Sequence, residues 1–138
     1  MKIKYVSDIH LEFSRFPVVE TLKELDPKSD EVLLVAGDTI VSSYLKEKRT
    51  DKNAETMQWR FDEFLNAVSG FKAVYMIAGN HESYSQGDVA HAKEIVQDYI
   101  DRKFANSNVK FLENERVQLT DKTDLLACTL WTDMNKGD

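Results

Sequence analysis

The sequence predicts an α/β fold in which a largely parallel sheet is assembled from alternating strands and helices. Apolar runs of strand length alternate with segments whose apolar residues recur every three or four positions. Past residue 104 short strand-like segments follow one another, which indicates an antiparallel extension or a second sheet. At 138 residues, with 42% hydrophobic and 30% charged residues, the chain has the size and composition of one globular domain spanning residues 1–138.

Strands and helices are expected in strict alternation over the first three quarters of the chain. The expected strands are residues 2–7, 31–37 and 72–79. The first is rich in β-branched and aromatic residues. The second and third are continuous apolar runs, which are typical of strands covered on both faces. The expected helices carry an apolar stripe and cover residues 18–25, 55–70 and 88–104. Three short strands should follow, over residues 109–113, 116–120 and 125–130. Residues 42–54 are highly charged without a pattern, and we expect a mobile loop there.

Composition excludes several classes of protein. The formal net charge of -6 gives no general attraction to nucleic acid, and no basic stripe offsets it. No apolar run approaches the roughly 20 residues of a membrane helix, nor does the N-terminus read as a signal peptide. Cys128 is the single cysteine, lies in an apolar run and is expected to be a buried structural thiol. We therefore expect a cytoplasmic protein without a membrane partner.

Metal-ligand types of residue follow each of the first three expected strands. They are Asp8 and His10 after the first, Asp38 after the second, and Asn80, His81 and Glu82 after the third. Ligand sites in open α/β sheets form outside the carboxyl ends of the strands, so these side chains should meet at one edge. Carboxylate, amide and imidazole ligands together suit divalent Mn, Fe, Zn or Ni.

The spacing suggests a role for each of the expected ligands. Asp8 and His10 can hold one ion together, and Asp38 can bridge two ions through its two oxygens. Asn80 offers a neutral oxygen to the second ion. Two ions about 3.5–4 Å apart stabilise in-line displacement at phosphorus, so the donor set indicates phosphoester chemistry.

Two further residues of the third segment are candidates for catalysis. His81 is free to protonate the leaving oxygen or to stabilise charge on the phosphoryl group. Glu82 follows directly and is the candidate to orient His81. The adjoining polar loops contain Arg15 and Tyr84, which are either substrate contacts or residues of ordinary surface turns.

The motifs SDIH, AGD and AGNHE, in this order, resemble those of the calcineurin-like metallophosphoesterase family. The start MKIKYVSDIHLEF and the late TLWTD resemble a bacterial and phage branch of it. The resemblance implies a β-sandwich flanked by helices, a two-metal centre, and hydrolysis of phosphomonoesters or phosphodiesters. It also implies that Asp8, His10, Asp38 and Asn80 are metal ligands and that His81 is the catalytic histidine.

The sequence departs from the family pattern in two places. The family often has an acidic or polar residue three positions after its Gly-Asp aspartate, where this chain has Val41. The family also has a further histidine and a Gly-His-x-His motif downstream, whereas the third histidine here, His91, falls in the expected helix 88–104. We therefore expect the C-terminal part of the domain to be missing, one ion to be held better than two, and hydrolysis by this chain alone to be weak.

Three interpretations of the chain stay open. It is an enzyme whose missing histidines come from a partner chain or a second protomer, an inactive relative that serves as a metal-binding or interaction module, or a fragment of a longer phosphoesterase. A small phosphorylated substrate is favoured over duplex DNA by the acidic charge. Self-association is expected because the missing layer should leave apolar residues uncovered, namely Leu125, Leu126, Leu130 and Trp131.

Overall fold

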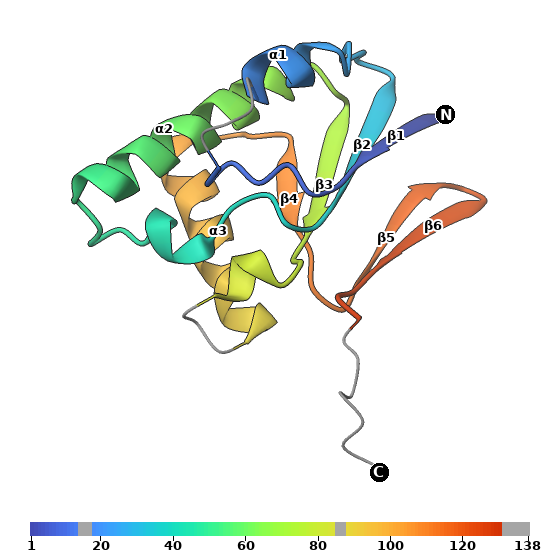
Figure 1. Cartoon of the computed structure of the whole chain (residues 1–138). Coiled ribbons are helices and arrows are strands. Elements are labelled where there is room, and N and C mark those ends of the chain that lie inside the picture. Colours follow the sequence, from blue (N-terminus) through green and yellow to red (C-terminus); the bar gives the residue numbers. More distant parts are fainter. Residues whose placement is uncertain (14–17, 85–87, 131–138) are drawn as a thin grey trace.

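The computed structural model describes residues 1–13, 18–84 and 88–130 (Figure 1). Four parallel strands form one sheet in the order β1-β2-β3-β4, and two antiparallel strands form a separate hairpin. The strands of the parallel sheet are β1 (Lys2–Val6), β2 (Glu31–Ala36), β3 (Ala73–Ile77) and β4 (Val109–Phe111). The hairpin consists of β5 (Glu115–Thr120) and β6 (Thr123–Ala127). The α/β fold with a parallel sheet is thus confirmed.

Helices connect the parallel strands. They are α1 (Val18–Lys23), α2 (Lys52–Ala67) and α3 (Val89–Lys103), together with the short 3-10 helices η1 (Ser42–Leu45) and η2 (His81–Ser83). Figure 1 shows α1, α2 and α3 on one side of the sheet and the β5–β6 hairpin on the other. Crossovers between parallel strands are almost always right-handed, so a sheet whose strands follow chain order receives its helices on one face.

This arrangement corrects the expectation that the inner strands are covered on both faces. In β3, Val74 and Met76 point toward the helices and are buried, whereas the alternate residues Tyr75 and Ile77 are only partly buried. In β1, Tyr5 is 81% exposed. The apolar runs therefore mark strands with one helix-covered face and one face that the described residues cover only in part.

The core lies between the sheet and the helices. Its largest fully buried side chains come from β2, β3, β4, α2, α3 and the segments that follow β1 and β2, and include Phe61, Phe64, Tyr99, Phe111, Leu11 and Ile40. Phe61 packs against both Phe64 and Tyr99, with ring centroids 5.8 and 5.7 Å apart. The helical stripes predicted from sequence are the faces that supply this core.

Residues 42–54, expected to form a loop, contain regular structure. Helix η1 buries Leu45 completely, and α2 begins at Lys52, three residues before the expected start at Glu55. Asp51 caps α2 by accepting a hydrogen bond from the backbone N–H of Ala54 at 3.2 Å. Because this stretch is highly charged, its sequence pattern did not reveal the helix cap at Asp51 or the buried turn of η1.

The strand that follows α3 is also placed differently from the expectation. Strand β4 pairs in parallel with β3 and completes the main sheet, so α3 is a crossover helix. Only β5 and β6 form the antiparallel pair. A cavity of about 130 Å³ separates the hairpin from the open face of the sheet, and Cys128 in its wall is partly exposed rather than buried as expected.

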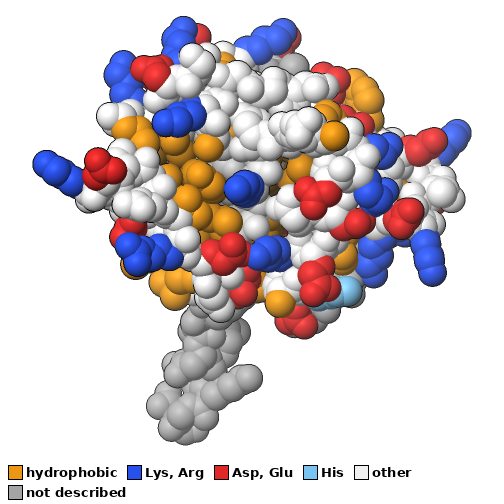
Figure 2. Space-filling view, turned by 180° about the vertical axis from the view of Figure 1, so that it is seen from behind, with side chains coloured by type: hydrophobic (Ala, Val, Ile, Leu, Met, Phe, Trp, Pro, Cys, Tyr) orange, Lys and Arg blue, Asp and Glu red, His pale blue; other side chains and the backbone are white. Residues whose placement is uncertain are grey.

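Apolar side chains also reach the surface. Figure 2 shows them gathered over the centre and left of the rear face, among charged groups. The most exposed large apolar residues outside the helices include Tyr5, Leu126 and Leu130. Among the described residues no helix has the length and apolar character that crossing a bilayer requires.

Candidate metal centre

The candidate site is built by the loops that leave β1, β2 and β3 at their carboxyl ends. The first loop runs alongside the second: the backbone N–H of Asp8 donates to the Gly37 carbonyl at 3.0 Å, and that of His10 donates to the Asp38 carbonyl at 2.9 Å. Parallel strand order thus carries residues from distant parts of the sequence to one edge of the sheet, as predicted.

Several candidate ligands have an unusual backbone conformation. Asp8, His10 and Asp38 have φ values of 56°, 49° and 55°, and Gly37 has a φ of 89°. Residues with side chains adopt the left-handed region at a cost, and such conformations cluster at functional sites. Alternating left-handed residues turn the first loop so that Asp8 and His10 reach the same side.

Three side chains from the three loops converge closely enough to share an ion. One ligand atom each from His10, Asp38 and His81 lie within 4.8 Å of one another. The Nε2 atom of His10 is 3.6 Å from an Asp8 carboxylate oxygen and 3.9 Å from one of Asp38. These separations are too long for hydrogen bonds. Bonds from zinc to an imidazole nitrogen or a carboxylate oxygen are about 2.0–2.2 Å long, so donor atoms this close together can bind one divalent ion after small side-chain movements.

The other two predicted ligands lie next to this cluster. Asp8 is at the exposed end of the first loop and faces His10. The Asn80 side chain faces both carboxylate oxygens of Asp38, at 3.1 and 3.2 Å. With its nitrogen turned inward the amide donates to both Asp38 oxygens, and its oxygen accepts from the Tyr84 hydroxyl. With its oxygen turned inward it offers a neutral ligand beside Asp38.

Glu82 does not contact the ring of His81, which corrects its predicted orienting role. Its carboxylate is buried and accepts hydrogen bonds from the backbone N–H groups of Asp38, Thr39 and Gly79, at 3.0, 2.5 and 2.8 Å. In η2 the side chain of Glu82 turns into the protein while that of His81 points into the site. Glu82 therefore ties the second loop to the third.

Glu12 makes the contact that was predicted for Glu82. One of its carboxylate oxygens lies 2.5 Å from Nδ1 of His81 and 3.1 Å from Nδ1 of His10. Glu12 was not among the site residues predicted from the sequence. The available signal was an acidic residue two positions after His10, in the turn that leaves a strand already assigned to the site.

Aromatic rings border the two histidines. Phe13, also missed from the sequence, lies 5.2 Å from the His10 ring and 6.0 Å from the His81 ring between centroids. Tyr84, predicted to contact substrate, has its ring 4.6 Å from that of His81 and its hydroxyl 2.9 Å from the side-chain amide of Asn80. Arg15, the other predicted substrate contact, lies outside the described residues. His91 is in α3 and half-exposed, as expected.

The charge of the site changes the proton affinity of two groups. Burial lowers the pKa of His10, but its hydrogen bond to Glu12 and the negative charges of Glu12, Asp38 and Asp8 more than offset this and raise the pKa above its usual value. Burial raises the pKa of Glu82, and its bonds to backbone N–H groups counteract this only in part. The cluster is thus strongly negative around the rings, a field that attracts a cation.

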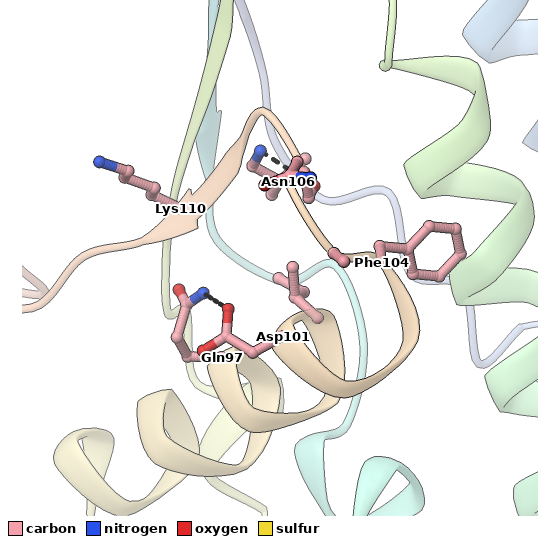
Figure 3. A pocket seen from close by; sticks show the side chains of 9 residues that line it. Gln97, Asp101, Phe104, Asn106 and Lys110 are labelled. Atoms are coloured by element: carbon pink, nitrogen blue, oxygen red, sulfur yellow. Dashed lines mark hydrogen bonds between the residues drawn. The ribbon is translucent and has the colours of Figure 1, made fainter.

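A cavity away from the loop cluster lacks such convergence of metal-ligand side chains. It measures about 220 Å³ and is walled by the C-terminal part of α3 and the start of β4, at the amino ends of the strands. Figure 3 shows the ring of Phe104 and the ammonium group of Lys110 directed away from each other, while Gln97 and Asp101 hydrogen-bond to one another. The candidate site is therefore the loop cluster at the opposite edge.

The fold and the cluster define a class of protein: an α/β protein with a candidate His–Asp–His metal site at the carboxyl edge of a parallel sheet. A family model described as calcineurin-like phosphoesterase matches residues 1–129, and the chain belongs to this family. Its members bind divalent metals, and membership implies a hydrolase. The comparisons with curated proteins and with solved structures gave no match.

Proposed function

We propose that this chain hydrolyses a phosphomonoester or phosphodiester with the help of a divalent metal ion held at the loop cluster. The observation that carries the proposal is the convergence of His10, Asp38 and His81, whose ligand atoms lie within 4.8 Å of one another. The cluster stands at the edge of the sheet where ligand sites form, in a chain of a phosphoesterase family.

Each residue has a role that follows from its position. His10, Asp8 and Asp38 would hold the first ion, and Asp38 with Asn80 would hold a second. A bound divalent ion polarises the phosphoryl oxygen and lowers the pKa of a coordinated water. His81 belongs to the same convergent group, but we assign it to the substrate rather than to an ion: it would donate a proton to the leaving oxygen or stabilise charge on the phosphoryl group. Tyr84 and Arg15 are proposed to contact the substrate.

The number of ions and their identity belong to the same proposal. The first site has two carboxylates and an imidazole, whereas the second has only Asp38 and Asn80 from this chain, so we propose one tightly held ion per chain. Oxygen and imidazole donors together suit Mn, Fe, Zn or Ni, and we propose manganese as the ion to test first. After dialysis we expect about one equivalent of manganese per chain. Two tightly held equivalents would contradict this expectation.

Activity should be measured with bis-p-nitrophenyl phosphate and with p-nitrophenyl phosphate, with added manganese and with a chelator. His81→Ala should lower turnover by about 100- to 10,000-fold, the usual contribution of a general acid or base. His91→Ala, on the half-exposed surface of α3, is the matched control and should keep the parent rate. Equal turnover for His81→Ala and the parent, or turnover that the chelator does not reduce, would overturn the proposal.

The same experiment tests the alternatives. A chain that retains manganese but hydrolyses neither ester would be a metal-binding or interaction module. Turnover that appears only when a second polypeptide carrying a Gly-His-x-His motif is added would indicate one half of a split enzyme. We further propose a small phosphorylated substrate, given the acidic net charge of -6, and a cytoplasmic location, given the single cysteine.

A further inference from the structure

Glu12 occupies an unusual position for a carboxylate. It stands in the turn after β1, two residues beyond His10, and its side chain is only 9% exposed. Lys and Arg are the usual partners of a buried carboxylate, but within the described residues no ion pair joins Glu12 to a Lys or Arg. The groups that its carboxylate meets are the rings of His10 and His81.

A single oxygen atom of Glu12 serves both rings. Its Oε1 lies 2.5 Å from Nδ1 of His81 and 3.1 Å from Nδ1 of His10, and the two ring centroids are 4.5 Å apart. A carboxylate oxygen has two acceptor positions, enough for both rings. An ionised carboxylate accepts and never donates, so both Nδ1 atoms must carry the hydrogen.

This hydrogen placement determines which nitrogen each ring offers to the site. With Nδ1–H directed at Glu12, Nε2 is the nitrogen left for other partners on both rings. For His10 that atom already faces the carboxylates of Asp8 and Asp38, at 3.6 and 3.9 Å. Glu12 thus leaves Nε2 of His10 directed at the carboxylates of Asp8 and Asp38 and leaves Nε2 of His81 without a role in that ring's own contact with Glu12.

The two glutamates near the site differ in how their second carboxylate oxygen is paired. Oε2 of Glu12 is buried and has no hydrogen-bond partner among the residues that the structure describes. Buried polar atoms are nearly always paired, so an unpaired one asks for an explanation. Neighbouring Glu82 provides the contrast, because both of its oxygens are paired with backbone N–H groups.

We propose that Glu12 is a positioning residue that holds His10 and His81 together through one carboxylate oxygen, so that both rings keep Nδ1 for Glu12 and leave Nε2 for the site. The direction given to the two rings rests on the proposed function. The control of their hydrogen placement by Glu12 can be measured without any turnover.

The test is ¹⁵N–¹H correlation NMR of the histidine rings in the metal-free full chain, at a pH where the rings are neutral. The parent should show Nδ1–H tautomers for His10 and His81. Glu12→Met keeps an unbranched side chain of similar length but removes the acceptor, and both rings should shift toward the Nε2–H tautomer. Glu12→Gln keeps one neutral, weaker acceptor and should give intermediate populations.

Two controls accompany these variants. His91 is the internal control, because it lies on α3 away from Glu12 and its tautomer should be the same in every spectrum. Glu24→Met replaces an exposed glutamate and should leave all three rings unchanged. Parent-like tautomers of His10 and His81 in the Met variant would overturn the proposal. If that variant fails to fold, parent-like tautomers in the Gln variant would overturn it.

Metal affinity and turnover complete the test. Loss of a residue that orients a ligating histidine lowers metal affinity by about 10- to 100-fold, and we expect this range for Glu12→Met, with partial recovery in Glu12→Gln. If the tautomers respond to Glu12 but the parent hydrolyses no phosphoester, the positioning role stands and the proposed function fails. If the parent hydrolyses phosphoesters but the tautomers do not respond to Glu12, the proposed function stands and the positioning role fails.

Discussion

Gly79 lies so close to the carboxylate of Asp38 that a Cβ atom on Gly79 would be 2.1 Å from Oδ1 of Asp38. The same Cβ would be 2.8 Å from the backbone nitrogen of Asp38, and one on Gly37 would be 2.7 Å from the backbone nitrogen of Gly79. The two loops therefore touch backbone to backbone at two glycines. This contact sets where the Asp38 carboxylate can lie.

Gly79→Ala should move that carboxylate and weaken metal binding. Rotation of Asp38 cannot relieve the clash fully, because the backbone of Asp38 is also within 3 Å of the new methyl group. We expect at least a 10-fold loss of manganese affinity by isothermal titration calorimetry, within the range seen when the support of a metal ligand is removed. Gly70→Ala is the control, since its Cβ would meet Pro27 at 3.1 Å, away from the site. Parent affinity in Gly79→Ala would contradict the prediction.

Glu82→Gln should destabilise the protein rather than affect catalysis alone. The carboxylate accepts from three backbone N–H groups of two loops, and the amide that replaces it turns a donor toward donors. The expected loss is about 1–3 kcal/mol of unfolding free energy, the cost of leaving buried partners unsatisfied. Urea unfolding measures it, with Glu24→Gln, an exposed glutamate, as the control. Unchanged stability with reduced turnover would instead restore the orienting role first predicted for Glu82.

The start of α2 should lose stability in acid. The hydrogen bond from Arg49 and the backbone N–H of Ala54 lower the pKa of Asp51 from 3.8 to about 2. A carboxyl group with a depressed folded-state pKa stabilises the fold above its unfolded pKa, and this contribution is lost as the pH falls from about 4 to about 2. Asp51→Asn should therefore lower Tm relative to the parent at neutral pH, and the difference should shrink across this window.

Thermal unfolding followed by circular dichroism at several pH values checks this dependence. Asp121→Asn, in the exposed turn between β5 and β6, is the matched control and should show no such window. A Tm difference between Asp51→Asn and the parent that stays constant down to about pH 2 would rule out the ionised cap.

Tyr99→Phe should cost stability through one lost hydrogen bond. The buried hydroxyl of Tyr99 on α3 donates to Asp62 on α2 at 2.6 Å, and burial together with that bond raises the pKa of Tyr99. Removing the hydroxyl leaves the Asp62 oxygen without this donor, at an expected cost of about 1–2 kcal/mol. Chemical denaturation measures it against Tyr5→Phe, whose side chain is exposed. Equal stability of the two variants would show that the bond contributes nothing.

We propose that the open face of the sheet drives association between chains. Leu126 on β6 is 75% exposed, near the partly covered face that includes Tyr75 and Ile77. Leu126→Lys should shift sedimentation toward the monomer, whereas Trp59→Lys, on an exposed position of α2, should not. If the parent chain sediments as a monomer at high concentration, the proposed association is wrong.

The periodicity of the apolar residues and the ends of the strands could be predicted directly from the sequence. Apolar spacing is a local property, so it located the strands and long helices, and strand order then implied that Asp8, His10, Asp38, Asn80 and His81 share one edge. The coverage of the sheet was not readable, because a continuous apolar run looks the same whether helices cover one face or both. The coverage depends on the order of the strands, which follows the chain and places α1, α2 and α3 on one face of the sheet.

Glu82 and Glu12 show most clearly what the sequence could and could not predict. Adjacency in the chain pointed to Glu82 as the partner of His81, but in η2 these neighbours face opposite ways, and Glu82 joins the backbone of another loop. The ring instead meets Glu12, 69 positions away along the chain. The sequence by itself determined which types of residue reach the edge of the sheet. Only the tertiary structure decided which carboxylate holds which group, because that depends on the direction of each side chain after the backbone turns.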